Sequence, residues 1–203
     1  MNADVDFFST LYRDNEDPWD VRQRWYERRK RALLLAVLPA ARFARVFEPA
    51  CGNGELTAAL AARSDTVIAG DFSAEAVAAA RRRLAGLDNV ALAVQTVPHQ
   101  WPAGERAGPY DLIVLSEFLY YLPHADIAIL ARCAAQSLST DGCLVACHWR
   151  PDFPQRTASS EAIHTRLGGE PGLHPLMHHE ETDFVLDVWS RDARSIIARE
   201  HHA

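Results

Sequence analysis

Five short, almost wholly apolar runs recur along the first 150 residues, and segments with helical signals separate most of them. The runs cover residues 45–50, 66–71, 89–95, 110–116 and 143–149. Strands that are apolar at nearly every position are buried on both faces, which is typical of a parallel sheet covered by helices on both sides. The sequence therefore predicts an α/β protein with a doubly wound, mostly parallel sheet.

The segments between and before these runs carry helix signals. A helix over 19–38 follows the acidic "NEDP", and Ser73 caps a helix that continues to about Leu84 with Glu75 in its first turn. Further helices are expected over 5–13, 55–62, 124–138 and 158–167.

The alternation breaks after Arg150. The runs at 183–191 and 194–200, joined by a tight turn, predict a C-terminal hairpin that completes a seven-stranded sheet with an antiparallel strand. We expect one domain over 1–203, with an N-terminal helical lid (1–40), a cofactor-binding core (41–150), and an acceptor loop and hairpin (151–203).

Charge and cysteine content narrow the class of protein. A net charge of −6 disfavours nucleic acid as a partner. The apolar part of 32–39 is too short to span a bilayer, so no membrane partner is expected. The four cysteines form no CxxC pair, which favours buried thiols in a reducing cytoplasm. The histidines of "HPLMHH" (174–179) lack partners at ligand spacing, so we expect no metal.

The stretch "FEPACGNGELT" (47–57) joins a strand to a helix through a Gly-x-Gly turn, which indicates a nucleotide or nucleoside pocket. A side chain at Gly52 or Gly54 would block the approach of the backbone to a ligand. The dinucleotide fingerprint requires Gly or Ala at the position that Thr57 occupies, which weakens the NAD interpretation. Asp71 closes the second strand and is placed to bind ribose hydroxyls in either kind of nucleoside.

The pattern Glu48-x-Ala50-x-Gly52-x-Gly54 resembles the first motif of class I S-adenosylmethionine (SAM) methyltransferases. The segment "YDLIVLSEFLYYL" (110–122) resembles the strand that runs out over the cofactor in those enzymes, with Ser116 and Glu117 at its exit. Methyltransferases that act on nucleobases carry an Asn/Asp-Pro-Pro-aromatic stretch at this place, and this chain does not.

The same segments, together with "DPW" (17–19), "WYERRK" (25–30), "AGDFS" (69–73) and "CLVACHWR" (143–150), resemble the nodulation protein S (NodS) family of small-molecule N-methyltransferases. The resemblance covers roughly 17–150. It implies SAM as donor, S-adenosylhomocysteine (SAH) as product, and an amine as acceptor, for example that of an amino sugar or a deacetylated chitooligosaccharide. The cofactor residues that it implies are Glu48, Ala50, Cys51, Gly52, Gly54, Asp71, Phe72, Thr96, Val97, Ser116 and Trp25.

One departure concerns the third strand. Thr96 stands where such enzymes usually carry an aspartate for the adenine amino group. Adenine contact is therefore assigned to the side chain of Gln95 or Thr96, or to the backbone of Val97.

An amine must lose its proton before it attacks, so a nearby carboxylate, phenol or imidazole is expected. Glu117 is the first choice to orient or deprotonate it, and Tyr120, Tyr121 and His148 are the others. Each also has a purely structural explanation, as an acid at a helix start, a core aromatic or a polar group at a strand end.

The aromatic residues Trp19, Trp25 and Tyr26 either form a lid over the ligands or pack the N-terminal helix onto the sheet. Three other functions stay open at this point: a small-molecule O-methyltransferase, a NAD-linked Rossmann enzyme, and a SAM-binding protein without catalysis. Both a monomer and a homodimer agree with the sequence.

Overall fold

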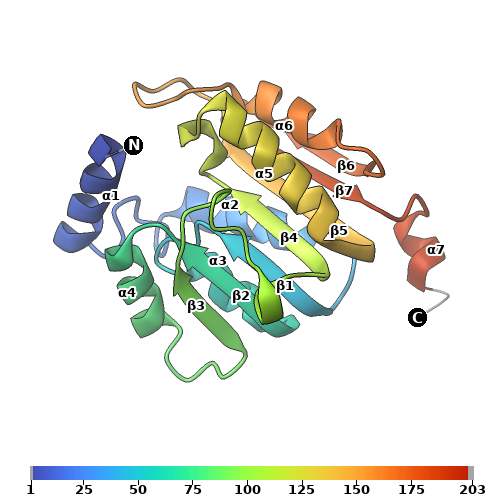
Figure 1. The fold of residues 1–203 in the computed structure, drawn as a ribbon, viewed down its shortest axis with the longest axis horizontal. Coiled ribbons are helices and arrows are strands. Elements are labelled where there is room, and N and C mark those ends of the chain that lie inside the picture. The colour runs from blue at the N-terminus through green and yellow to red at the C-terminus, as the bar shows by residue number, and fades with distance from the viewer. Residues whose placement is uncertain (1, 201–203) are drawn as a thin grey trace.

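The computed structural model describes residues 2–200, in which seven strands form one sheet with helices on both faces (Figure 1). The strand order is β3-β2-β1-β4-β5-β7-β6. β1 to β5 run parallel, and β7 is antiparallel to both of its neighbours. The strands are β1 (Phe43–Pro49), β2 (Ser64–Asp71), β3 (Val90–Val94), β4 (Tyr110–Ser116), β5 (Leu138–Trp149), β6 (His174–Glu180) and β7 (Phe184–Ser190). The predicted doubly wound, mostly parallel fold is confirmed.

Two apolar cores lie against the two faces of the sheet. Buried side chains of α2 (Trp25–Ala36), α3 (Glu55–Ala61) and α4 (Ala74–Arg83) belong to one core. Those of α5 (His124–Ser137) and α6 (Ser160–Gly168) belong to the other. α1 (Asn2–Asp14) packs beside α4 at one side of the molecule (Figure 1). Two 3-10 turns, η1 (Gly104–Arg106) and η2 (Leu119–Tyr121), flank β4, and α7 (Ile196–Glu200) follows β7.

Local chemistry explains where several elements begin. Ser73 accepts a hydrogen bond from the backbone N–H of Ala76 at 3.2 Å, so the predicted cap of α4 is confirmed. Asp17 accepts bonds from the N–H groups of Val21 and Arg22 at 2.9 and 3.0 Å. Such bonds compete with helix formation. The helix expected from residue 19 therefore begins only at Trp25.

The predicted C-terminal hairpin is wrong in its second strand. Residues 196–200 form helix α7, and the partner of β7 is β6, which precedes it. Asp192 explains the difference, because its carboxylate accepts the N–H of Arg194 at 2.9 Å and its carbonyl accepts from Arg199 at 2.5 Å. These bonds turn the chain away from the sheet. All seven residues of β7 are buried, which suits a strand with neighbours on both edges.

β5 is longer than predicted, because Leu138 already pairs with Tyr110 before a register shift. Across the described residues, no helix has both the length and the apolar character needed to cross a membrane.

Candidate active site

A cavity of about 550 Å³ opens at the carboxyl ends of β1, β2, β4 and β5, beneath the N-terminal segment. Its volume lies in the usual range for a small-molecule or cofactor site. Ten of the predicted site residues line it: Glu48, Ala50, Cys51, Gly52, Asp71, Phe72, Ser116, Glu117, Tyr120 and Tyr121. The sheet topology therefore brings the residues after four separate strands into one hollow, as expected for an open α/β sheet.

The loop after β1 has a left-handed backbone at Ala50, Gly52 and Gly54, with φ of 57°, 54° and 82°. A Cβ on Gly52 would lie 2.6 Å from the hydroxyl of Tyr12, which closes over the loop from α1. A Cβ on Gly54 would lie 3.0 Å from Leu84 Cδ1 instead. Gly52 therefore lines the cavity, where its lack of a side chain leaves room for Tyr12. Gly54 lies outside the lining, and its lack of a side chain lets α3 pack closely on α4.

Glu48 is buried at the end of β1 and lines the cavity. Its Oε2 finds no hydrogen-bond partner among residues 2–200. Burial, aided by the charge of Asp71, raises the pKa of Glu48 to about 8, although the Thr57 side chain acts to lower it. A buried carboxyl with an open oxygen is suited to a ligand that brings a positive charge or a donor.

Asp71 ends β2 and accepts backbone N–H groups on both oxygens, from Gly52 at 3.0 Å and from Ser73 at 3.0 Å. Burial raises the pKa of Asp71 to about 6, although these two hydrogen bonds lower it. The bonds fix the orientation of the carboxylate at the edge of the cavity, and each oxygen keeps a lone pair for a further donor.

Glu117 follows β4 with a left-handed backbone, φ 61°, which is costly for a residue other than glycine and frequent at functional sites. Its Oε2 accepts the hydroxyl of Tyr120 at 2.7 Å and the N–H of Trp149 at 2.8 Å. Its Oε1 lies 2.7 Å from Lys30 Nζ. Three donors therefore hold this carboxylate at the exit of the strand.

Lys30 is the only lysine of the sequence, and it is 8% exposed in the cavity wall. Its Nζ also contacts Glu27 Oε2 at 3.0 Å. Burial alone would lower the pKa of Lys30, but the attraction of Glu117 and Glu27 raises it above its usual value. Lys30 and Glu27 are functional candidates that our reading of the sequence missed. Two signals were available: both residues lie in "WYERRK" (25–30), a segment of the family resemblance, and Lys30 is a lone lysine within an arginine-rich run.

Aromatic side chains of the N-terminal segment cover the cavity. Phe8 contacts the rings of Trp19, Phe72 and Tyr121, with centroids 6.1, 5.5 and 5.0 Å apart. Trp19 lines the cavity, as the lid interpretation requires. Trp25 does not line it and is 72% exposed. The residues of α2 that do line it are Glu27, Lys30, Arg31 and Leu34, which share one face of that helix.

Three further predicted residues lie away from the cavity. Thr96 is exposed, and its N–H donates to Gln100. Val97 belongs to the core on the α5 side. His148 is fully buried and bonds to His164, because it alternates along β5 with Cys147 and Trp149, which both face the cavity. Tyr26 also lies outside the lining, where its ring packs on Trp149 and Phe184.

In the described part of the chain, no group of three or more His, Cys, Asp or Glu side chains has a geometry that could hold an ion.

Comparison with known proteins gives the family. The profile of the methyltransferase domain family matches residues 46–142. A candidate methyltransferase from Pseudomonas syringae, known from its crystal structure, shares 49% sequence identity over 82% of this chain and 99% of its own, with a TM-score of 0.70. The chain belongs to the class I methyltransferases. The cofactor of this class is SAM, and the open acidic oxygen, the glycine at the loop and the oriented Asp71 fit it.

Two other similar proteins carry the names of different methyltransferases. N-methyltransferase NodS from Bradyrhizobium japonicum WM9, in complex with SAH, has a TM-score of 0.81 and 21% identity, covering 92% of this methyltransferase and 97% of NodS. Trans-aconitate 2-methyltransferase from Methylobacterium nodulans is 36% identical over 159 residues, which are 75% of this chain. The match spans 57% of the length of that curated relative.

Proposed function

We propose that this methyltransferase transfers a methyl group from SAM to the amine of a small molecule. The observation that carries the proposal is the cluster of Glu27, Lys30 and Glu117 in the cavity wall. Two carboxylates and one ammonium leave this cluster with a net charge of −1. A site of this charge favours an acceptor that arrives as a cation.

The residues around the loop after β1 account for cofactor binding in this proposal. Glu48 receives the amino group of SAM on its open oxygen, and Asp71 receives the ribose hydroxyls. Arg31 lines the cavity and is the candidate for the carboxylate, since it donates to the carbonyl of Val21 and keeps further N–H groups. Gln95 follows β3 and lies outside the cavity lining, but its buried Nε2 has no partner in the described chain, which makes it the candidate for adenine.

When bound, SAM supplies a methyl group that is already activated on a sulfonium. The protein therefore contributes mainly alignment, which is worth up to about 7–11 kcal/mol in well-oriented systems. Glu117 performs this task in our proposal. Its carboxylate accepts an N–H of the amine and turns the nitrogen lone pair toward the methyl group, while Tyr120 and the Trp149 N–H keep it from rotating.

The acceptor side of the cavity also has an aromatic wall of Tyr121, Trp149 and Phe153. Aromatic faces bind both a cation and the apolar face of a sugar ring. An amino sugar combines these two features, so we propose it as the first acceptor to test. The fold shared with an N-methyltransferase agrees with this choice.

A specific observation favours a second candidate, O-methylation of a carboxylic acid. Arg24 and Arg31 line the same cavity, and a curated relative is named as a trans-aconitate methyltransferase. If both arginines faced the acceptor, the site would suit an anion.

The test is turnover with SAM and two matched sets of acceptors, followed by mass spectrometry of the products. One set contains amino sugars and simple amines, and the other contains di- and tricarboxylic acids. We expect an added methyl group in the amine set only, and a loss of product with Glu117→Gln. Methylated acids with unmodified amines would replace the first proposal by the second.

A further inference from the structure

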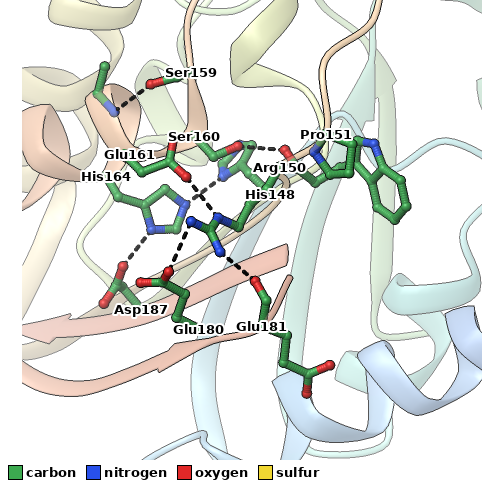
Figure 2. Close-up of polar contacts among 12 residues, drawn as sticks. His148, Arg150, Pro151, Ser159, Ser160, Glu161, His164, Glu180, Glu181 and Asp187 are labelled. Atoms are coloured by element: carbon green, nitrogen blue, oxygen red, sulfur yellow. Dashed lines mark hydrogen bonds and ion pairs between the residues drawn. The ribbon is translucent and has the colours of Figure 1, made fainter. Parts of the chain in front are cut away.

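Behind the cavity, four side chains from four elements form a continuous hydrogen-bonded chain. His148 Nδ1 of β5 lies 2.9 Å from His164 Nε2 of α6, and His164 Nδ1 lies 2.6 Å from Asp187 Oδ2 of β7. Figure 2 shows these two contacts, which follow one another through the His164 ring. On the other side of Asp187, Oδ1 lies 2.7 Å from His178 Nδ1 of β6.

The chain runs from the interior to the surface. His148 is fully buried, and His164 and Asp187 are nearly so. The side chain of His178 is 59% exposed at the edge strand β6. A buried chain of imidazoles and a carboxylate is expensive to build unless every member is satisfied.

The carboxylate fixes which nitrogen of each imidazole carries a proton. Asp187 is an acceptor on both oxygens, so His164 and His178 donate to it from Nδ1. A neutral His164 then accepts at Nε2, and the donor must be Nδ1–H of His148. This leaves His148 Nε2 as a bare lone pair. That atom is buried and has no hydrogen-bond partner within residues 2–200.

The His148 ring, which carries the unpartnered Nε2, packs against Tyr120 in the wall of the cavity. The His148 and Tyr120 rings meet edge to face, with centroids 5.5 Å apart and an angle of 80°. Tyr120 in turn donates its hydroxyl to Glu117 at 2.7 Å. The Tyr120 and His148 side chains show ring contact but no hydrogen bond, so a proton crosses this link through a water molecule or a small shift of the rings.

We propose that His148 and His164 together accept the proton that the methylated amine releases. This inference rests on the proposed amine methylation. The amine gives its first proton to solvent as it enters the cavity, so a neutral nitrogen attacks. The nitrogen–methyl bond forms as the sulfur–methyl bond breaks, and the product nitrogen gives its proton to Glu117. The Tyr120 hydroxyl, which donates to Glu117 at rest, turns its hydrogen toward His148. Its oxygen then accepts the proton from Glu117, and the hydroxyl proton moves to His148 Nε2. The Nδ1 proton of His148 moves to His164 Nε2, and the imidazolium forms on His164, paired with Asp187. The proton returns along the same path in reverse and reaches solvent after the product leaves the cavity.

The surrounding charges explain why the proton ends on His164 and not on His148. Burial, then His164, Arg156 and Lys30 lower the pKa of His148 well below its usual value. His164 instead faces the carboxylate of Asp187 and the ring of Trp189.

His178, when protonated, competes with an imidazolium on His164 for the carboxylate of Asp187. It faces Asp187 and Glu180, whose contacts raise the pKa of His178. When His178 is charged, it disfavours an imidazolium on His164. We therefore expect the accepting pair to weaken as His178 becomes protonated.

The first test is independent of turnover. Long-range ¹H–¹⁵N spectra of histidine-labelled protein should show the Nδ1–H form of His148 while the pair is neutral. When the pair takes up a proton, the imidazolium should form on His164 and His148 should move to the Nε2–H form. A neutral His164 beside an Nε2–H form of His148, or an imidazolium at His148, would overturn the proposal.

The second test compares turnover of three variants over a range of pH. Asp187→Asn removes the countercharge and should lower kcat about tenfold or more, without changing SAH affinity. His178→Asn removes the competing cation and should extend activity to lower pH. His179→Asn, on the same strand and outside the chain, is the control and should leave the pH profile unchanged.

If Asp187 and His178 only stabilised the fold, both Asp187→Asn and His178→Asn would lose activity. An equal loss in the two variants would therefore overturn the proposal. Wild-type protein that binds SAH and methylates no amine would refute the proposed function, while the spectra would still decide the proton positions.

Discussion

Lys30 Nζ lies 2.7 Å from Glu117 Oε1, and this ion pair joins helix α2 of the N-terminal segment to the end of β4. The contact links a residue of the covering segment to the carboxylate that we assign to the acceptor. Glu117 carries a left-handed backbone there, so the pair also holds a costly conformation in place.

Lys30→Met should lower the free energy of unfolding, because it leaves Glu27 and Glu117 together without their shared cation. Charged hydrogen bonds of this kind are worth about 1.5–3 kcal/mol. Urea denaturation of the variant measures the loss, and a cycle with Glu117→Gln isolates the pair. Arg29→Met is the matched control, since it breaks the more exposed pair with Glu181 on the same helix and should cost less. Equal losses in the two variants would contradict the buried role of Lys30.

Asp71→Asn should weaken SAH binding about tenfold to a hundredfold, given about 1.5–3 kcal/mol for a charged hydrogen bond and about 1.4 kcal/mol per tenfold. Calorimetric titration gives the dissociation constant. Asp65 lies on the same strand and forms an exposed ion pair with Arg42. The control variant Asp65→Asn should bind SAH like the wild type. An unchanged dissociation constant in Asp71→Asn would remove this carboxylate from the ribose site.

SAH binding should release protons at neutral pH. Glu48, with a pKa of about 8, is mostly protonated at pH 7, and the ammonium of the ligand favours the ionised form. Affinity should therefore rise between about pH 6 and pH 8 and level off above. Calorimetry in two buffers of different ionisation enthalpy counts the protons, and Glu48→Gln should abolish the release. No proton release by the wild type would place the amine elsewhere.

The same groups predict how the ligand-free protein responds to pH. The folded-state pKa values of Glu48 and Asp71 are raised, to about 8 and about 6. Their contribution to stability is therefore present at acidic pH and is lost as pH rises toward 8. Thermal unfolding across this range should show a larger stabilisation by SAH at pH 8 than at pH 6.

Phe8→Ala should raise the dissociation constant of SAH about tenfold, a loss of about 1.4 kcal/mol. Phe8 is buried and packs on Trp19, Phe72 and Tyr121 over the cavity. Its neighbour Phe7 is 46% exposed, so Phe7→Ala is the control and should have the smaller effect. Faster dissociation of SAH from Phe8→Ala would identify the covering segment as the barrier to release. Identical rates in both variants would exclude that role.

Much of the fold could be predicted because its signals are local. Apolar runs marked the five parallel strands, and the cap at Ser73 marked α4. The second hairpin strand could not be predicted from the same kind of signal. Ile196 and Ile197 suggest a strand, but the bonds of Asp192 turn the chain into a helix.

The residues of the site also fall into those that could be predicted from local signals and those that could not. Glu48, Gly52, Asp71 and Glu117 could be predicted because each lies at or just after the end of a strand, and strand ends meet at one edge of the sheet. Strand alternation alone would have placed His148 on the face opposite Cys147 and Trp149. Lys30 could not be found, because its role depends on how α2 packs across the sheet.

The central claim is that this cavity binds the nucleoside of SAM, and calorimetric titration with SAH, with NAD as the comparison ligand, tests it most directly. We expect micromolar binding of SAH, about −8 kcal/mol, and no binding of NAD. Binding of NAD, or no heat with SAH, would contradict the assignment of Glu48 and Asp71 to the cofactor.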